Sequence, residues 1–390
     1  MKISRIWWPI ILWFLSYPYS GFGACEQVSH EDQEWPASLP AHDQADQELL
    51  SYIKGVSGRE DSQSRNWESN ALIIVHKNEL MLEYYAHGYD ASRKHLLWSI
   101  TKSILNALVG IAVGEGKISL NQSLAHYLPD FPQLSTVTID HLMAFSSGIN
   151  WNETYENSLP HRSSVMAILY ANTPRSIKAA LLPYQLKNAP GKQWSYSSGD
   201  SFWLALVLQA VYGESYHGMP WQKLFEPLGI TSATLESDHE GTFYMSSYGY
   251  MTARDLVRFG LLYLHGGCIN GQALLPQRGD IPESPDLSWV EWSMEPSKAL
   301  LDYLASPDAE PGQGGRHFWL NLSKDVSGQT PPYPSAPSDI LVGMGHWGQR
   351  IYILPAWDMV VVRLGNDRTT EYWDDEGFLQ HLSRWKEAKR

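Results

Sequence analysis

The stretch S-I-T-K-S-I-L-N-A-L-V-G-I-A-V-G, residues 99 to 114, carries the strongest pattern in the chain. Apolar residues recur along it at the spacing of a helix, from Ile100 to Ile111. Gly114 and Gly116 close the pattern, which predicts a buried helix that begins at Ser99.

Ser99 and Lys102 form a candidate reactive pair at the start of this helix. Residues three apart lie on one helix face, so the Lys102 amine can reach back to the Ser99 hydroxyl. A serine at its ordinary pKa is a weak nucleophile and needs a neighbouring base. The S-x-x-K spacing also occurs at Ser51 and at Ser383. The spacing alone therefore does not single out Ser99, and the rest of the chain must be considered.

Strand patterns lie at both ends of the chain and helical patterns in the middle. Strands are predicted at 71–76, 80–86, 347–354 and 359–364. Helices are predicted at 138–145, 165–172, 201–212, 252–265 and 372–386. Residues 276–340 are rich in proline and suggest irregular structure, either a lid over a site or a plain surface insertion. The order of elements implies one α/β domain at 70–390, with a helical lobe inserted at about 116–250.

The composition is that of a globular protein without a nucleic-acid surface. The chain has 390 residues, 43% hydrophobic and 18% charged, with a formal net charge of −13. This is ample for a large core, and no run of Lys or Arg offers a surface to nucleic acid. Neither H-E-x-x-H nor G-x-S-x-G occurs in the sequence. Zinc hydrolysis and an α/β-hydrolase elbow are therefore unsupported, and we expect no cofactor and no obligate protein partner.

The N-terminus has the features of an export signal. Lys2 and Arg5 flank the start of an apolar stretch at 6–19, and small residues lead to Cys25. The stretch is shorter than the ~20 residues that span a bilayer. We expect a signal peptide at 1–24, then a polar segment at 25–69, in an exported protein that is periplasmic or membrane-anchored.

The two cysteines allow two alternatives. The segment before Cys25 resembles a bacterial lipoprotein processing site, in which Cys25 would carry a lipid and anchor the protein to a membrane. Cys268 is the other cysteine, and in an oxidising compartment it can instead form a disulfide with Cys25.

Two later segments carry groups suited to acyl transfer. Tyr196 lies in P-G-K-Q-W-S-Y-S-S-G-D, residues 190–200, and a phenol near a lysine can pass protons to and from a nucleophile. The segment G-H-W-G-Q, residues 345–349, is predicted at the start of a strand. Its glycines allow backbone to approach a ligand, and an edge N–H there can complete an oxyanion hole with the N–H of Ser99.

Together these segments resemble the β-lactamase-related serine hydrolases. That group includes class C β-lactamases, DD-carboxypeptidases, D-aminopeptidases, family VIII carboxylesterases and 6-aminohexanoate-dimer hydrolases. Its shared pattern is S-x-x-K, then Y-x-N or S-x-N, then K-T-G or a variant. Stretches at 138–148, 250–267 and 348–362 also match the family's supporting segments in order.

The resemblance implies a fold and a mechanism. The fold is a mainly antiparallel sheet flanked by helices, with an inserted helical lobe and the site between lobe and sheet. Ser99 would form an acyl-enzyme, Lys102 and Tyr196 would share the acid–base work, and the N–H groups of Ser99 and Gln349 would hold the oxyanion. No metal or organic cofactor is implied.

Two departures from the family pattern bear on the substrate. Ser198 stands where β-lactamases usually have Asn, and a hydroxyl cannot make the two-ended contact of an amide. The segment His346-Trp347-Gly348 replaces K-T-G, and a neutral histidine anchors a substrate carboxylate less well than lysine. Arg350 is near enough in sequence to compensate if its side chain points to the site. The departures favour an esterase or amidase.

Several aromatic residues lie beside the motifs. Trp98, Trp194 and Trp347 either wall an apolar acyl pocket or pack in the core. Trp151 and Tyr155 follow the S-S-G loop and are candidates for the entrance of the site.

The sequence thus predicts a serine hydrolase acting on an ester or amide of a small substrate. One alternative is a DD-carboxypeptidase or a weak β-lactamase of the cell envelope. The other is a sensor or binding module that is acylated without turnover.

Overall fold

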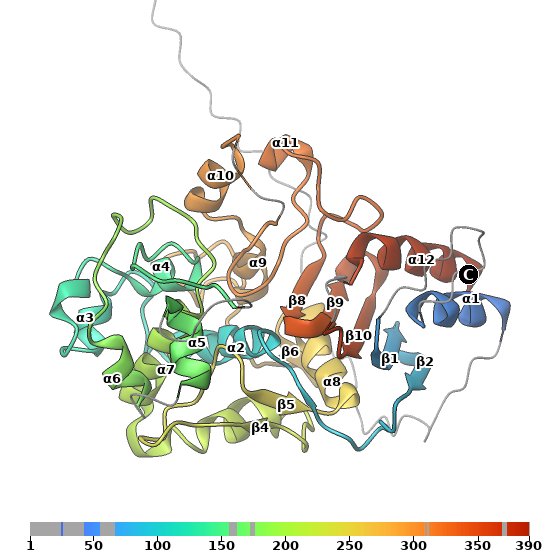
Figure 1. Ribbon diagram of the computed structural model, residues 1–390, viewed down its shortest axis with the longest axis horizontal. Helices are drawn as coiled ribbons and strands as arrows, with labels where there is room; N and C mark the ends of the chain where they lie inside the picture. The colour runs from blue at the N-terminus through green and yellow to red at the C-terminus, as the bar shows by residue number, and fades with distance from the viewer. Residues whose placement is uncertain are drawn as a thin grey trace, which may run out of the picture.

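The computed structural model describes residues 25, 43–54, 67–155, 162–171, 176–307, 309, 312–368 and 373–389. The predicted signal peptide and most of the polar segment that follows it lie outside these residues. A five-stranded sheet stands beside a helical lobe (Figure 1). Within the described part of the chain, no helix is long and apolar enough to cross a membrane.

The sheet joins the two ends of the domain. Its strands run in the order β2-β1-β10-β9-β8, and every neighbouring pair is antiparallel. The strands are β1 (Ser69–His76), β2 (Glu79–Tyr85), β8 (Leu341–Gly345), β9 (Gln349–Leu354) and β10 (Met359–Gly365). Four of them confirm the predicted strands. The sequence analysis missed β8, which is short, contains two glycines and directly follows the proline-rich stretch.

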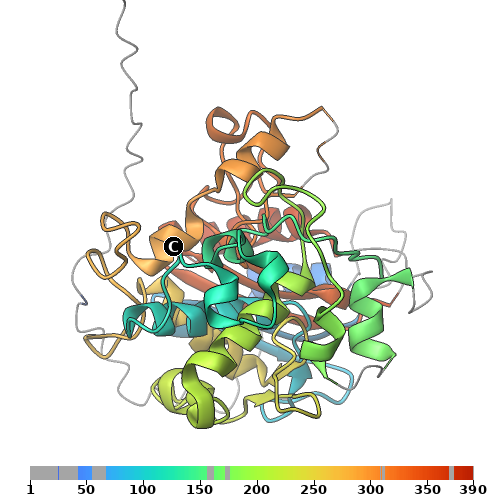
Figure 2. The ribbon, with the colours of Figure 1, turned by 90° about the vertical axis from the view of Figure 1, so that its left-hand side faces the viewer.

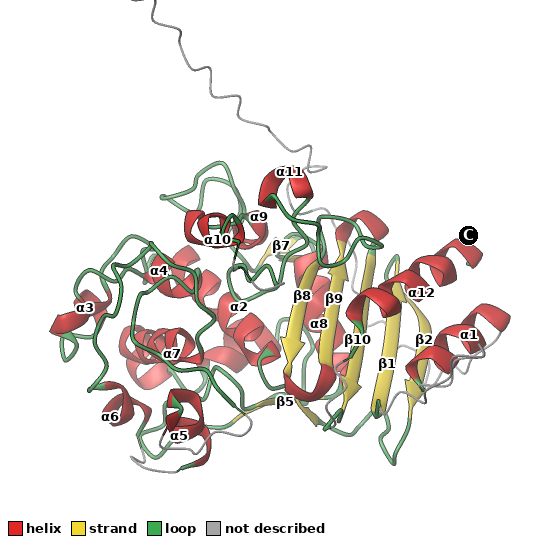
Figure 3. Ribbon diagram, turned by 45° about the horizontal axis from the view of Figure 1, so that its top comes forward, coloured by secondary structure: helices red, strands yellow, loops and turns green. Residues whose placement is uncertain are grey.

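Both faces of the sheet are buried. Successive residues of a strand point to opposite faces, and the strands carry apolar residues on both. Ile73 and Val75 of β1 belong to the larger core, which α8 (Ala253–Leu264) and α2 (Ile100–Gly114) share. Leu72 and Ile74 face a second core built by α1 (Gln44–Ile53) and α12 (Asp375–Ala388). Figure 3 shows α1 and α12 in front of the sheet and α8 behind it.

The lobe consists of helices gathered around α2 and α7 (Figure 2). They are α3 (Leu124–Tyr127), α4 (Ile139–Met143), α5 (Ser164–Tyr170), α6 (Ile177–Leu181) and α7 (Ser198–Tyr212). The helices predicted in this region are present, with shorter bounds for α4 and α5. A small sheet of β3 (His95–Leu96), β5 (Gly249–Met251) and β4 (Thr234–Leu235) lies below the start of α2.

The segment 276–340 is more regular than the sequence analysis expected. It contains α9 (Trp289–Met294), α10 (Lys298–Leu304) and α11 (Lys324–Ser327). The Trp289 side chain is completely buried against Gly110 of α2, and its indole N–H donates to the buried Asn106 at 2.8 Å. Gly110 is required there, since a Cβ would come within 2.6 Å of that ring. The segment is therefore part of the core and not a plain surface insertion.

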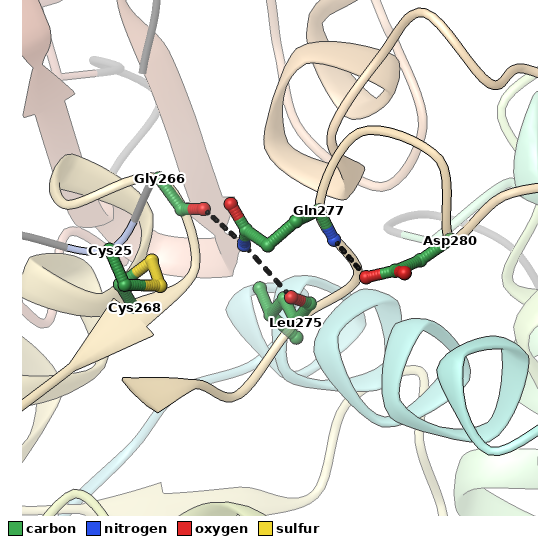
Figure 4. Close-up of a disulfide and its surroundings, with 6 residues drawn as sticks. All are labelled: Cys25, Gly266, Cys268, Leu275, Gln277 and Asp280. Carbon is green, nitrogen blue, oxygen red and sulfur yellow. Dashed lines mark hydrogen bonds between the residues drawn. A yellow bond between two sulfur atoms is a disulfide. The ribbon is translucent and has the colours of Figure 1, made fainter. Parts of the chain in front are cut away.

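Of the two alternatives for Cys25, the structure contains the disulfide. Cys25 is bonded to Cys268 in the hairpin of β6 (Cys268–Ile269) and β7 (Gln272–Ala273) (Figure 4). Beside it, the Gln277 amide donates to the carbonyl oxygens of Gly266 and Leu275. A sulfur bonded in a disulfide cannot at the same time carry a lipid thioether.

Candidate active site

Ser99 lies at the N-cap of α2, and its hydroxyl makes no capping hydrogen bond. Serines at two other helix starts behave differently: Ser163 and Ser288 each accept a backbone N–H of their own helix. The chain enters α2 through Leu97, whose N–H donates to the Gly249 carbonyl at 2.8 Å, and through Trp98 in the left-handed region at φ +50°. A bulky residue there is uncommon and is held by its surroundings. Ser99 remains partly exposed with its hydroxyl free for other contacts.

Lys102 is the predicted base, and its amine touches the Ser99 hydroxyl. The side chain is 2% exposed. Its Nζ lies 3.1 Å from Ser99 Oγ, 3.0 Å from Ser198 Oγ and 2.8 Å from the Ser246 carbonyl oxygen. Burial disfavours the charged form and lowers the pKa of Lys102 to about 8, although the charge of Glu153 opposes this shift. An amine with that pKa can serve as a base near neutral pH.

Tyr196 completes the predicted trio. Its hydroxyl lies close to Ser99, and its ring lies 5.1 Å from Lys102 Nζ. Burial raises the pKa of Tyr196 above its ordinary value, so the phenol keeps its proton at neutral pH. The ring stacks on Trp319 and contacts Phe145, and these contacts fix its position beside Ser99. The structure thus brings Ser99, Lys102 and Tyr196 together as expected.

A small pocket that is partly open to solvent lies beside these three residues. Its other lining residues are Phe145, Gly314, His317, Phe318, Trp319 and Met344. Burial lowers the pKa of His317 to about 3, so its imidazole is neutral at pH 7. Among the described residues that line the pocket, Lys102 is the one cation. Four of the lining residues, 314 and 317–319, come from the segment 276–340, which forms a wall of the site.

The expected oxyanion donor Gln349 is in the wrong place. Its side chain is fully buried and binds the backbone of Gly365, with the amide N–H at 2.7 Å from the carbonyl oxygen. Its own backbone faces Gly345 inside the sheet. The backbone N–H and C=O of Val342 both form hydrogen bonds with Trp319, on the side of β8 away from β9. Because the direction of backbone hydrogen bonds alternates along a strand, the N–H and C=O of Gly345 point the other way, toward Gln349 of β9. The prediction that the backbone N–H of Gln349 holds the oxyanion is therefore wrong, because that N–H faces the neighbouring strand.

The same alternation shows which N–H groups face outward. Starting from Val342, the groups at Met344 and His346 point to the open edge of β8, since Gly345 is extended at φ −116° and ψ 152°. Met344 lines the pocket. An ideal Cβ on Gly345 would be 2.2 Å from the Leu97 carbonyl oxygen, so this edge lies against the residues just before Ser99.

The conformation of the turn 346–348 is determined by contacts within the protein. Gly348, at φ +84°, is required because a Cβ would strike Arg363 and Asp367, which form a buried ion pair beneath the turn. The His346 ring stacks on Tyr155, with centroids 5.5 Å apart. Trp347 packs on Trp98. The expectation that these glycines make room for a ligand is not what the structure shows.

The remaining tryptophans and Arg350 lie outside the pocket lining. Trp194 is buried behind Gly314, which favours the core-packing alternative for it. Trp151, a candidate for the entrance, packs on Gly199 of α7 and is not among the lining residues. Arg350 is paired with Asp375 of α12 at 2.7 Å. It therefore does not compensate for the lysine missing from the K-T-G position.

Ser198 and Glu153 have roles that the sequence analysis did not foresee. Ser198 is completely buried and contacts Lys102, so it is not a substitute for a substrate-binding asparagine. Its hydroxyl and its backbone N–H both donate to the Glu153 carboxylate, at 2.6 and 2.8 Å. No motif marks Glu153; the one signal was its position between Trp151 and Tyr155.

No cluster of three or more metal-ligating side chains occurs in the described part of the chain. The reactive groups present are the hydroxyl of Ser99, the amine of Lys102 and the phenol of Tyr196, beside outward backbone N–H groups. This set can perform nucleophilic acyl transfer.

Comparison with known proteins agrees with this geometry. The family model described as Beta-lactamase matches residues 59–382. The 6-aminohexanoate-dimer hydrolase of Paenarthrobacter ureafaciens is 25% identical over 339 residues, which cover 82% of this chain and 79% of that protein. Two solved structures share the fold. EstCE1, a hydrolase with promiscuous acyltransferase activity, has a TM-score of 0.64 and 15% identity, covering 88% of this chain and 99% of that one. A penicillin binding protein from Bacillus halodurans has a TM-score of 0.56 and 15% identity, covering 82% and 97%.

The match covers the sheet, the lobe and all three predicted catalytic residues. The chain belongs to the Beta-lactamase family and is a β-lactamase-related hydrolase.

Proposed function

We propose that this protein is a serine hydrolase that cleaves an ester or amide of a small substrate through an acyl-enzyme. The observation that carries the proposal is the meeting of Ser99, Lys102 and Tyr196 at one pocket, with 3.1 Å between the Lys102 amine and the Ser99 hydroxyl. Ser99 is the nucleophile, because its hydroxyl is left free by its helix and contacts a buried amine.

In the first half-reaction Ser99 Oγ attacks the substrate carbonyl carbon while Lys102 Nζ takes the hydroxyl proton. The carbonyl oxygen becomes an oxyanion, which the N–H of Ser99 and the outward N–H groups of Met344 and His346 stabilise. The bond to the leaving group then breaks, and the leaving alcohol or amine receives a proton through Tyr196. In the second half-reaction water attacks the carbonyl carbon of the acyl-enzyme, and its proton passes to the same groups. The bond to Ser99 Oγ then breaks, the proton returns to Ser99 and the carboxylic acid leaves.

The lining of the pocket supports an uncharged acyl group. Phe145, Phe318 and Trp319 present aromatic surface, and His317 is neutral. A substrate carboxylate would find no free cation among the described lining residues, since Lys102 is engaged at the nucleophile and Arg350 is paired elsewhere. These contacts favour an esterase or amidase over a β-lactamase or DD-peptidase. A relative named for hydrolysis of an amide dimer agrees with this choice.

We also propose that the protein is exported to an oxidising compartment. The signal-like stretch at 1–24 and the Cys25–Cys268 disulfide both support this location.

Labelling with a fluorophosphonate tests the proposal directly. Intact-mass spectrometry should show one adduct on the wild type and none on Ser99→Ala. Turnover of p-nitrophenyl esters and of a linear amide, compared with nitrocefin and a D-Ala-D-Ala peptide, then tests the substrate class. A folded wild type without an adduct would overturn the proposal. Activity confined to nitrocefin or the D-Ala peptide would overturn the preference for esters and amides, and an acyl-enzyme that never turns over would show a sensor.

A further inference from the structure

The loop after Gly148 brings one carboxylate to the start of α7. Trp151 of this loop lies flat against Gly199, where a Cβ would come within 2.5 Å of its ring. Glu153 follows and receives four hydrogen bonds. Its Oε1 accepts from Ser198 Oγ at 2.6 Å and from the Tyr155 hydroxyl at 2.7 Å, and its Oε2 accepts from the Ser198 N–H and the Trp151 indole N–H.

These contacts decide the direction of every hydrogen bond around Lys102. The Ser198 hydroxyl has one proton and gives it to Glu153, so its oxygen can only accept from Lys102 Nζ. The carbonyl oxygen of Ser246 can likewise only accept. When Lys102 is neutral, its two protons are therefore used by Ser198 and Ser246. The remaining position on the nitrogen is the lone pair, and it faces Ser99 Oγ at 3.1 Å.

We propose that Glu153 is a positioning residue that acts through Ser198 to direct the lone pair of Lys102 at the Ser99 hydroxyl. The set Lys102, Ser198 and Glu153 is called the relay below. The proposal rests on the proposed function, because it matters only if Lys102 is the base. Glu153 is not among the pocket-lining residues and shares no hydrogen bond with Ser99, so it acts on Ser99 through the groups that it binds or whose charge it influences.

The charge of Glu153 has a second, separable effect on Lys102. Glu153 favours the protonated amine and partly offsets the burial that lowers the pKa of Lys102. The other titratable groups around the amine are Tyr196 and Tyr155, whose pKa values burial raises, and His317, whose pKa burial lowers to about 3. On α7, burial raises the pKa of Asp200 to about 8; the Ser147 hydroxyl donates to it at 2.7 Å.

Glutamine at position 153 cannot reproduce the relay, although it has the same shape. Each carboxylate oxygen accepts two protein donors, so either orientation of the amide places an NH₂ against two donors. If the amide NH₂ faces the Ser198 hydroxyl, the hydroxyl proton must turn away from it and can point at Lys102. The lone pair then loses its fixed direction.

The experiment measures the rate of fluorophosphonate labelling at Ser99 against pH for Glu153→Gln, Ser198→Ala and the double variant. A positioned base contributes about 10²–10⁴ to rate, so we expect Glu153→Gln to lower the plateau by about tenfold or more. Removal of the negative charge lowers the pKa of Lys102, so the acidic limb of the profile should also move to lower pH. Ser198→Ala should lower the plateau with little movement of the limb, because Glu153 keeps its charge. The double variant should lose less than the product of the two single losses, since all three groups act in one relay.

Glu115→Gln is the matched control. The Glu115 carboxylate also accepts hydrogen bonds from a tyrosine hydroxyl, that of Tyr212, and from a charged amine, that of Lys223. It lies at the far end of α2, and a helix rise of 1.5 Å per residue places it about 24 Å from Ser99. Its profile should equal that of the wild type, and thermal melts should show that all variants are folded. The proposal is overturned if Glu153→Gln labels as fast as the wild type. A lower plateau with an unmoved limb would show a merely structural role and would also overturn it. Absence of labelling in the wild type would instead remove the proposed function, and this inference with it.

Discussion

Replacing Lys102 by methionine should remove activity and stabilise the fold, the latter in a pH-dependent way. The lysine is 2% exposed, and burial lowers its pKa from 10.5 to about 8. A lower pKa in the folded state means that the folded protein disfavours the charged amine. The lysine therefore destabilises the fold at any pH at which it is protonated in both the folded and the unfolded state. The penalty is therefore complete below pH 8, fades between pH 8 and 10.5, and is absent above that range.

The size of the effect follows from these two pKa values. The penalty is about 3 kcal/mol at pH 6 and below about 1 kcal/mol at pH 10, at 1.36 kcal/mol for each pKa unit. Methionine carries no charge and has no such penalty. It also leaves the Ser198 hydroxyl and the Ser246 carbonyl without their partner, but that cost is the same at both pH values. The difference in unfolding free energy, variant minus wild type, should therefore be about 2–3 kcal/mol more favourable at pH 6 than at pH 10.

Urea unfolding of both proteins at the two pH values measures this difference, and fluorophosphonate labelling measures the loss of reactivity. We expect labelling at Ser99 to slow by about 10²–10⁴. Lys187→Met is the control, since Lys187 is exposed and its replacement should change stability equally at both pH values. The reasoning is refuted if the stability difference is independent of pH, or if the variant labels as fast as the wild type.

Three further predictions concern the rest of the molecule. Intact-mass spectrometry of the mature protein without reductant should show Cys25 and Cys268 as a disulfide, two hydrogens lighter than the reduced form; a diacylglyceryl group on Cys25 would contradict this. Asp367→Ala leaves the guanidinium of Arg363 buried without its carboxylate and should cost about 3–5 kcal/mol in urea unfolding. A loss below 1 kcal/mol, within the range of a surface pair, would count against that account. Trp319→Ala enlarges the pocket and should raise kcat/KM for longer acyl esters relative to the acetate, by about fourfold for each methylene newly buried. An unchanged ratio would show that the acyl chain lies elsewhere.

Local patterns were enough to find most of the strands and to name Ser99 and Lys102 as one of three S-x-x-K candidates, and the later motifs favoured this pair. Ser99 and Lys102 are three residues apart in a helix, so the covalent chain itself brings the hydroxyl and the amine together at 3.1 Å. The strands β1 and β10 are apolar on both faces, and their burial follows from that composition. The strand β8 escaped notice because two glycines and a neighbouring proline-rich stretch weaken its pattern.

Tertiary structure decided what the individual groups near the pair do. Gln349 and Met344 belong to adjacent strands, and only the pairing of β8 with β9 and with Trp319 determines which backbone N–H groups face the pocket. Ser198 contacts Lys102, and not a substrate, because α7 packs against α2. Glu153 reaches Ser198 across 45 residues of chain.

The sequence by itself indicated the fold class and the candidate residues Ser99, Lys102 and Tyr196, because strand and helix patterns are local and the ordered motifs resemble those of one family. Only the tertiary structure decided the lining of the pocket, the outward edge of β8, the pairing of Arg350 with Asp375 and the carboxylate behind the lysine. The physical reason is that hydrogen-bond direction and burial depend on which segments meet in space, and one sequence position carries no record of its distant neighbours.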